Sequence, residues 1–313
     1  MEFKHEPVLY EEVIELLSVK PSGIYVDGTM GSGGHGEGIC EILSEDGWYV
    51  GIDRDWEAVK ETEKRLEKYR CKKTFIKGNF KDIKSFLEDL GVDEIDGALL
   101  DLGVSSYQLD NPERGFSYMQ DAPLDMRMDT ESSLTAFEVV NSYKQEDLSR
   151  IIFKYGEERY ARSIASLIIK ERESGPIETT FQLVDIIKRA IPAKARREGP
   201  HPAKRTFQAI RIEVNGELSE LGEGISDFID VLKEEGRLLI ISFHSLEDRI
   251  AKEVIQKRLN PCECPKTLPQ CVCGKVTDIK KVTTKPVTAG EDELLRNPRA
   301  RSAKLRVIEK QGA

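Results

Sequence analysis

A glycine-rich stretch indicates the fold class: Asp27-Gly28-Thr29-Met30-Gly31-Ser32-Gly33-Gly34-His35-Gly36. It follows an apolar run at 24–27 typical of a β-strand and precedes a segment with a helical pattern. Glycines let the chain turn tightly and let a ligand approach the backbone, and the N-terminus of the next helix presents free N–H groups. The spacing of Gly31, Gly33 and Gly36 is that of dinucleotide-binding loops, so the stretch predicts a nucleotide-binding unit. A tight turn without a ligand is the alternative.

Strands and helices alternate over the first hundred residues, which predicts a parallel sheet covered by helices. After Leu102 the pattern becomes helical and stays so to Val214, and the run 237–243 then reads as a central strand. We therefore predict a sheet domain formed by residues 1–105 and 215–313, with an all-helical subdomain, 106–214, inserted into it. The predicted strands are 24–27, 48–53, 74–78, 97–102, 237–243 and 303–309.

Polar side chains follow the predicted strands where open α/β sheets bind ligands. Asp53 ends the second strand, where a carboxylate accepts hydrogen bonds from ribose hydroxyls, although an Asp at this position is also a common turn or cap residue. Phe80, after the third strand, would lie beside an adenine ring or belong to the core, and Asp101 ends the fourth strand. Dehydrogenases and methyltransferases share this arrangement. Asp27 favours a methyltransferase, because the methionine ammonium of S-adenosylmethionine needs acidic acceptors.

The segment Ser242-Phe243-His244-Ser245-Leu246-Glu247-Asp248-Arg249 follows the fifth predicted strand. Ser245 and Asp248 have the spacing of a capping box for the next helix. His244 would then lie in the corner between strand and helix, over the ligand cleft. It is either a general base or a structural hydrogen-bond partner.

Basic residues are concentrated in two stretches of a chain whose formal net charge is −9. Residues 186–211 hold eight basic residues and one acidic residue, and residues 249–310 hold 15 basic and 7 acidic residues. This asymmetry indicates a surface that faces a polyanion, and the alternative is a solvated face. The residues predicted to bind RNA phosphates are Arg196, Arg197, Lys204 and Arg205.

Composition excludes several classes of protein. The 313 residues, 39% hydrophobic and 33% charged, are typical of a globular chain with one or two domains, and no apolar run approaches the roughly 20 residues of a membrane span. The N-terminus lacks a signal-peptide pattern, so we expect a cytoplasmic protein. Six cysteines are too few for a disulfide scaffold.

Four of the cysteines form two C-x-C pairs, Cys262 with Cys264 and Cys271 with Cys273. Four thiolates this close in sequence could hold a structural zinc ion. Because the spacing departs from the usual C-x2–4-C pattern, we assign no metal on the sequence alone.

Several motifs, spread over nearly the whole chain, add to this reading. By them the chain resembles the bacterial small-subunit ribosomal RNA (cytosine-N4) methyltransferase H family, also called MraW. The stretches that carry the resemblance are His5-Glu6-Pro7-Val8-Leu9, the glycine loop to Gly36, Asp101-Leu102-Gly103-Val104-Ser105-Ser106, Arg114-Gly115-Phe116-Ser117, Pro123-Leu124-Asp125-Met126-Arg127-Met128-Asp129, Lys204-Arg205-Thr206-Phe207-Gln208-Ala209, Ser242 to Arg249 and Asn297-Pro298-Arg299-Ala300-Arg301-Ser302.

The resemblance implies a Rossmann-like class I methyltransferase sheet and an inserted helical subdomain that helps to hold RNA. It implies S-adenosylmethionine as methyl donor and a cytidine of the decoding region as acceptor, within an assembled or nearly assembled small ribosomal subunit. By the same analogy Gly33, Gly34 and His35 line the methionine end, Asp53 the ribose and Phe80 the adenine. Asp101 and Gln108 complete the cofactor pocket. Whether the protein forms a homodimer is left open.

The chain departs from the (Asp/Asn/Ser)-Pro-Pro-aromatic tetrapeptide that many amino-methyltransferases carry after the fourth strand. Here that place holds Asp101-Leu102-Gly103-Val104-Ser105. We therefore expect Asp101 or nearby carbonyls to accept from the cytidine amine, Phe116 or Tyr118 to stack on the base, and His244 or solvent to take the proton. The rival classes are a methyltransferase for DNA or a small molecule, a nicotinamide-dependent dehydrogenase and a non-enzymatic RNA-binding factor.

Overall fold

The computed structural model describes residues 7–197, 199–265 and 272–312. The chain divides into two compact units, one formed by Met1–Gly103 with Leu218–Ala313 and the other by Val104–Glu217. We call them the sheet unit and the helical unit. The sequence placed the insertion at 106–214, and the observed unit extends two residues further toward the N-terminus and three toward the C-terminus.

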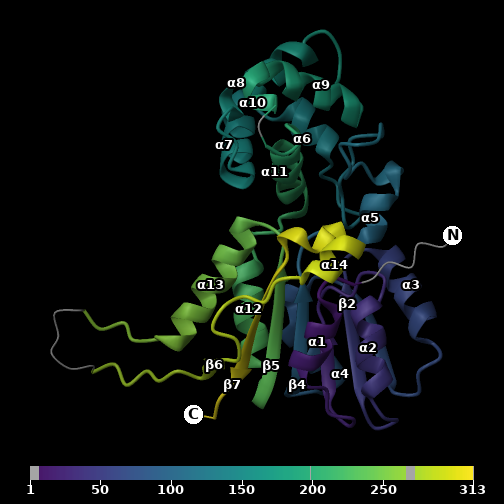
Figure 1. The fold of residues 1–313 in the computed structure, drawn as a ribbon, viewed down its shortest axis with the longest axis vertical. Helices are drawn as coiled ribbons and strands as arrows, with labels where there is room; N and C mark the ends of the chain where they lie inside the picture. The colour runs from purple at the N-terminus through teal and green to yellow at the C-terminus, as the bar shows by residue number, and fades with distance from the viewer. Residues whose placement is uncertain (1–6, 198, 266–271, 313) are drawn as a thin grey trace. The chain divides into compact units, whose positions relative to one another are not determined.

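The sheet unit is built on seven strands in the described residues, in the order β3-β2-β1-β4-β5-β7-β6 (Figure 1). Strands β1 to β5 pair in parallel, and β7 is antiparallel to both β5 and β6. The order reverses between β1 and β4, the switch point at which such sheets bind ligands. The strands are β1 (Ile24–Asp27), β2 (Trp48–Asp53), β3 (Lys72–Lys77), β4 (Ile95–Asp101), β5 (Leu232–Ser242), β6 (Ile279–Lys281) and β7 (Lys304–Lys310).

Helices cover both faces of this sheet, which explains why its central strands are apolar along their whole length. Tyr25 and Leu99 face a core formed with α1, α2 and α3, whereas their neighbours Val26 and Leu100 face a core formed with α4, α12 and α13. The helices of this unit are α1 (Tyr10–Leu17), α2 (Gly34–Ile42), α3 (Trp56–Leu66), α4 (Ile83–Leu90), α12 (Leu221–Asp230), α13 (Ser245–Leu259) and α14 (Glu291–Arg296).

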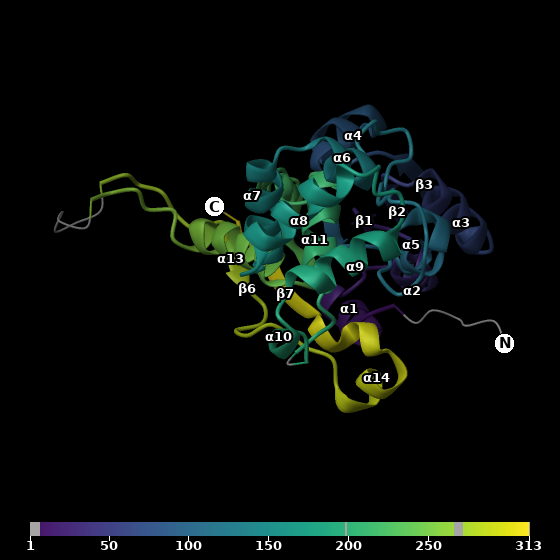
Figure 2. The ribbon, with the colours of Figure 1, turned by 90° about the horizontal axis from the view of Figure 1, so that it is seen from above.

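The helical unit has a separate core of its own. Leu148, Ile151 and Ile152 of α7 pack with Ile164 and Ile168 of α8, following the helical spacing that the sequence shows. A side chain at Gly156, where α7 ends, would come within 2.5 Å of the Arg205 carbonyl, so this glycine lets α7 and α11 approach closely. The helices are α5 (Ser106–Asp110), α6 (Ala136–Ser142), α7 (Gln145–Gly156), α8 (Ala161–Arg172), α9 (Thr180–Ala190), α10 (Ala193–Arg197) and α11 (Lys204–Asn215), and Figure 2 shows them from above.

The predicted parallel sheet is confirmed for β1 to β5, and β7 adds an antiparallel strand to it. Strands β1 and β2 have the predicted bounds, and β3, β4, β5 and β7 differ at their ends. Strand β6 is not among the predicted strands, and in the described residues it pairs with β7. Among the described helices, none combines the length and apolar composition needed to cross a bilayer.

Candidate active site

The loop between β1 and α2 has the tight geometry that its glycines predict. Gly31 and Gly33 have φ values of 50° and 79°, and Gly33 is the N-cap of α2. A Cβ atom would lie 2.8 Å from Thr62 at Gly33, 2.5 Å from Pro7 at Gly34 and 2.5 Å from the Tyr49 hydroxyl at Gly36. These glycines therefore allow close packing of the loop against the protein itself, in addition to leaving its backbone accessible.

Two carboxyl groups hold this loop in place. Asp53 Oδ2 accepts a hydrogen bond from the Gly31 N–H at 2.9 Å, and Oδ1 accepts from the Asp55 N–H at 2.9 Å. Asp27 is buried and accepts from the Thr29 N–H and the Tyr49 hydroxyl. Burial raises the pKa of Asp53 to about 6 and that of Asp27 to about 7, although these hydrogen bonds act in the opposite direction.

Asp101 lies at the end of β4 beside His35. The His35 Nε2 lies 3.0 Å from the Val8 carbonyl, so this nitrogen carries the proton, and Nδ1 then faces Asp101 Oδ2 at 3.7 Å. Burial lowers the pKa of His35 to about 4, so the imidazole is neutral. Burial and the charges of Asp27 and Glu247 raise the pKa of Asp101 well above its ordinary value.

Asp101 Oδ1 is buried and has no hydrogen-bond partner among the residues that the structure describes. Buried polar atoms in proteins normally have partners, so this atom marks a place where a ligand can bond. The charges that act on Asp101 are negative. A cationic or hydrogen-donating ligand at this edge of the sheet would therefore be stabilised, and an anionic one would not.

His244 caps helix α13, and the predicted capping box is wrong by one residue. The N-cap is His244 and its partner is Glu247, in place of Ser245 and Asp248. Glu247 Oε2 accepts from the Phe243 and His244 N–H groups at 2.8 and 3.2 Å. His244 Nδ1 accepts from the Glu247 N–H at 3.4 Å, and Nε2 lies 3.1 Å from Glu247 Oε1. Nδ1 thus belongs to the helix cap, which favours the structural alternative for this histidine, whereas Nε2 makes no hydrogen bond with the described residues.

Phe80 is buried beside α12. A Cβ atom at Gly224 of α12 would come within 2.7 Å of its ring, and the residue belongs to the core on that face of the sheet. Asn79, the residue before it, donates to Glu220, and so does Lys81 after it. These contacts fix the backbone of this turn, and packing alone explains the aromatic side chain.

The remaining predicted site residues belong to the helical unit. Gln108 Oε1 accepts from the Ser105 N–H, and the Gln108 N–H donates to Ser105 Oγ, so the two form the capping box of α5. Phe116 is buried in the core of this unit. The ring of Tyr118 is stacked on His201, with centroids 4.7 Å apart. Tyr118 is therefore the more accessible of the two aromatic residues.

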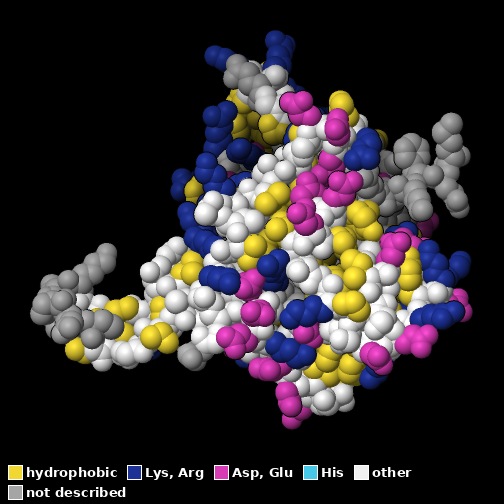
Figure 3. Space-filling view, turned by 60° about the horizontal axis from the view of Figure 1, so that its bottom comes forward, with side chains coloured by type: hydrophobic (Ala, Val, Ile, Leu, Met, Phe, Trp, Pro, Cys, Tyr) yellow, Lys and Arg dark blue, Asp and Glu magenta, His cyan; other side chains and the backbone are white. Residues whose placement is uncertain are grey.

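The basic residues predicted to bind RNA differ in their surroundings. Arg196 and Arg197 of α10 and Lys204 of α11 are exposed. Arg205 is exposed too, but its Nη1 donates to the Glu157 carbonyl at the end of α7, so it also stabilises a helix terminus. Figure 3 shows Lys and Arg side chains along the left margin of the upper part of the view and both signs of charge mixed over its lower part.

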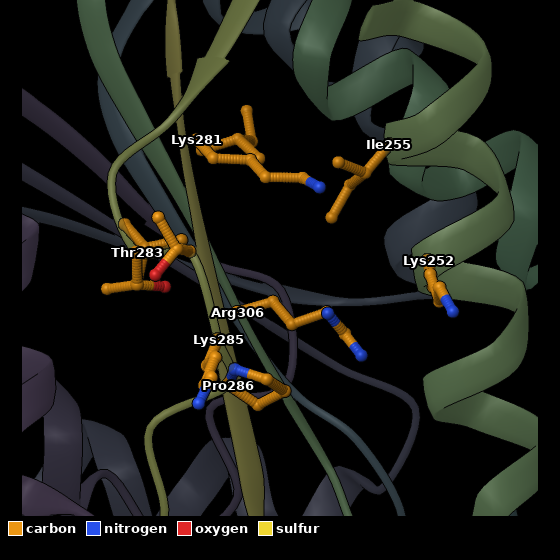
Figure 4. Close-up of a pocket in the computed structure, with 10 residues that line it drawn as sticks. Lys252, Ile255, Lys281, Thr283, Lys285, Pro286 and Arg306 are labelled. Carbon is orange, nitrogen blue, oxygen red and sulfur yellow. The ribbon is translucent and has the colours of Figure 1, made fainter.

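A second basic surface lies in the sheet unit. A hollow of about 240 Å³ lies between α13 and the strands β6 and β7, and Figure 4 shows Lys281 and Arg306 reaching from these strands toward α13. Its lining residues are Lys252, Ile255, Lys281, Thr283, Thr284, Lys285, Pro286, Arg306, Val307 and Ile308. Arg306 also donates to Asp248, which offsets part of the positive charge.

Some residues of the site were missed from the sequence. Thr29 Oγ1 accepts from the Asp101 N–H and so joins the β1 loop to β4. The Val8 carbonyl fixes the tautomer of His35, and Glu247 holds the corner after β5. The position of Glu247 three residues after His244 was the one available signal, since a capping-box partner has this spacing.

The sheet order, the glycine loop and the acidic ends of β1, β2 and β4 define a Rossmann-like class I methyltransferase. The chain belongs to the MraW methylase family, whose model matches residues 2–311. This confirms the resemblance drawn from the motifs.

Close relatives cover the whole chain. It is 55% identical to "Ribosomal RNA small subunit methyltransferase H" of Ruminiclostridium cellulolyticum, over 99% of this chain and 100% of the relative. It is 53% identical to the protein of that name in Clostridioides difficile, over 99% and 100% of the two chains. Among solved structures, a putative rRNA methylase from Clostridium thermocellum superposes with a TM-score of 0.45 at 9% identity, covering 97% of this chain and 93% of that one. The family assignment rests on the sequence matches and not on that overlap.

Asp101→Asn should stabilise the ligand-free protein. In the folded state the pKa of this carboxyl lies above 3.8, so ionising it destabilises the fold. This loss of stability is absent below pH 3.8 and grows as the pH rises. We expect a melting temperature about 1 to 3 °C higher at neutral pH and a smaller gain near pH 4, measured by calorimetry. The matched control is Asp96→Asn, since Asp96 pairs with Lys233 at 2.7 Å and should lose stability. A lower melting temperature for Asp101→Asn would contradict the electrostatic argument.

Proposed function

We propose that this protein transfers a methyl group from S-adenosylmethionine to the exocyclic N4 of a cytidine in the decoding region of small-subunit ribosomal RNA. The proposal rests on relatives whose names describe a methyltransferase for small-subunit ribosomal RNA. They align with nearly the whole chain at 53 to 55% identity. The carboxyl groups at the ends of β1, β2 and β4 agree with it, because they suit a cationic donor.

The residues at the sheet edge fit this donor. S-adenosylmethionine supplies a methyl group already activated by the positive charge on sulfur. We propose that Asp53 accepts from the ribose hydroxyls and that the backbone of Gly33 and Gly34 borders the methionine end. His35, held neutral by burial, adds no positive charge that would repel the ligand. We propose that Phe80, although mostly buried against α12, borders the adenine.

Asp101 is the residue that we propose for the reacting end. We infer that the unpartnered Oδ1 accepts a hydrogen bond from the amine of the base, which lets that nitrogen rehybridise toward the methyl group. The lone pair of a cytosine amine is conjugated with the ring, so orientation and an acceptor matter more than a strong base. We assign the released proton to solvent, since the lone pair of His244 Nδ1 already accepts from the Glu247 N–H and the neutral ring then carries its proton on Nε2.

We propose that the helical unit binds the RNA through Arg196, Arg197 and Lys204, with Arg205 at the same end of α11. Tyr118 is the aromatic residue that we propose for stacking on the base. The hollow lined by Lys252, Lys281, Lys285 and Arg306 offers further phosphate contacts. The substrate of such an enzyme is an assembled or nearly assembled small subunit in the cytoplasm, and a homodimer is compatible with this function.

Transfer of a labelled methyl group tests the proposal directly. The purified protein is incubated with methyl-labelled S-adenosylmethionine and with small subunits from cells that lack this modification, the RNA extracted from them, or DNA. We expect N4-methylcytidine in the RNA after nuclease digestion and chromatography, and no transfer with Asp101→Ala. Label in DNA, or at another atom of the base, would show that the substrate assignment is wrong. Binding of donor without transfer to any substrate would indicate a non-enzymatic factor.

His244→Asn separates a capping role from a proton-acceptor role. Asparagine is a good N-cap residue, so the variant should keep the start of α13 and the stability of the protein. We expect a single-turnover rate within about twofold of the unchanged protein. If His244 were the base, the rate would fall by about 10²-fold or more while stability stayed the same. His244→Leu, which cannot cap, should lose stability by about 1 kcal/mol.

Removing the exposed positive charges of the helical unit should weaken RNA binding. In the triple variant Arg196→Ala, Arg197→Ala and Lys204→Ala, the fall of the log association constant with log salt should become shallower by about 2. Each phosphate contact on single-stranded RNA contributes about 0.7 to that slope. Affinity for S-adenosylmethionine should not change. The control is Arg189→Ala, whose charge is already paired with Glu171 and Asp185. An unchanged salt slope in the triple variant would rule out these residues as the contacts.

A further inference from the structure

The segment between α13 and β6 runs away from the sheet unit and returns to it (Figures 1 and 2). In its described parts, residues 260–265 and 272–278, most side chains are exposed, and Val272 and Val276 are 77% and 70% exposed. These residues bury too little apolar surface to fix two lengths of chain against each other. An ordered arrangement here needs another source of stability.

Three cysteines from the two lengths of chain converge in this segment. The Sγ atoms of Cys262, Cys264 and Cys273 all lie within 4.8 Å of one another. In a tetrahedral zinc site with Zn–S bonds of about 2.3 Å, the sulfur atoms are about 3.8 Å apart. Small side-chain movements would bring the three thiolates to that separation. Cys271, the fourth cysteine of the sequence pattern, lies outside the described residues.

Polar contacts around the three sulfur atoms support the same arrangement. The Val272 N–H donates to Cys264 Sγ at 3.4 Å, a backbone contact of the kind that orients metal-bound thiolates. Lys275 and Glu263 form an ion pair at 2.6 Å that joins the outgoing and returning chain. Gly274, with φ 65°, lets the chain turn directly after Cys273.

We propose that Cys262, Cys264 and Cys273 bind a zinc ion that fixes the fold of residues 260–278. Thiolates are soft ligands that select zinc over magnesium or calcium, and zinc at such sites is structural. Binding displaces the thiol protons, so each Zn–S bond replaces an S–H bond and no oxidant is needed. The fourth tetrahedral position is filled by a ligand other than these three. The site is separate from the methyl-transfer residues and independent of the proposed function.

Metal analysis of the full-length protein, purified without a histidine tag or chelator, tests this proposal. We expect one zinc per chain by mass spectrometry, released by a mercurial thiol reagent. Exchange for cobalt should give thiolate-to-cobalt charge-transfer absorption. The double variant Cys262→Ser with Cys264→Ser should lose the metal and become sensitive to proteases within 260–278. Cys71→Ala, which removes a buried cysteine of the sheet unit, is the control and should keep the metal.

Two further measurements distinguish loss of the metal from loss of the overall fold. The far-ultraviolet circular dichroism of the double variant should match that of the unchanged protein, and chelation of zinc from the unchanged protein should by itself increase cleavage within 260–278. A protein without metal whose thiols are all titratable, a disulfide among these cysteines, or a metal retained by the double variant would each overturn the proposal.

Discussion

Carboxyl groups gathered at one edge of a parallel sheet, one of them fully buried and two half-buried, are the interaction on which this structure depends. The carboxyl ends of β1, β2 and β4 meet at this edge, so Asp27, Asp53 and Asp101 are brought together by topology. Backbone N–H groups compensate the first two in part, and the charges of Asp27 and Glu247 act against Asp101. The arrangement lowers the stability of the free protein, and a cationic ligand would recover that energy.

Packing on both faces of the sheet compensates for the stability that is lost to these carboxyl groups. The cores on the two sides of β1, β2, β4 and β5 are independent sets of buried residues, and the glycines of the β1–α2 loop are crowded by Thr62, Pro7 and Tyr49. The loop therefore cannot relax away from the carboxyl groups. Its rigidity comes from this crowding, since the protein itself fills the space that a side chain at each of these glycines would need.

The periodic parts of the fold were predictable and the irregular parts were not. The helix α9 carries clear signals in the sequence, because Thr179 and Gln182 form a capping box before an apolar stripe and Pro192 follows. Strand β6 was missed, since three residues with one buried side chain carry no periodic signal and their only partner, β7, is distant in sequence. Residues that match the family motifs also include ones with a structural role. Arg114 donates to the carbonyls of Arg127 and Met128, which is a structural contact within the helical unit.

The site shows the same limit at the level of single side chains. Two residues chosen from the sequence, Gln108 and His244, each form half of a capping box. A helix that begins after a strand at the ligand-binding edge needs hydrogen-bond acceptors at its first turn, and a ligand at that edge needs polar groups of the same kind. The sequence can place such a residue at the edge. Only the direction of its polar atoms shows whether it caps the helix or binds a ligand. Asp101 differs from both because it caps no helix and its Oδ1 has no partner within the described chain. His244 Nε2 also lacks a hydrogen bond there, but its ring is held by the cap that Nδ1 forms, so the chemistry is assigned to Asp101.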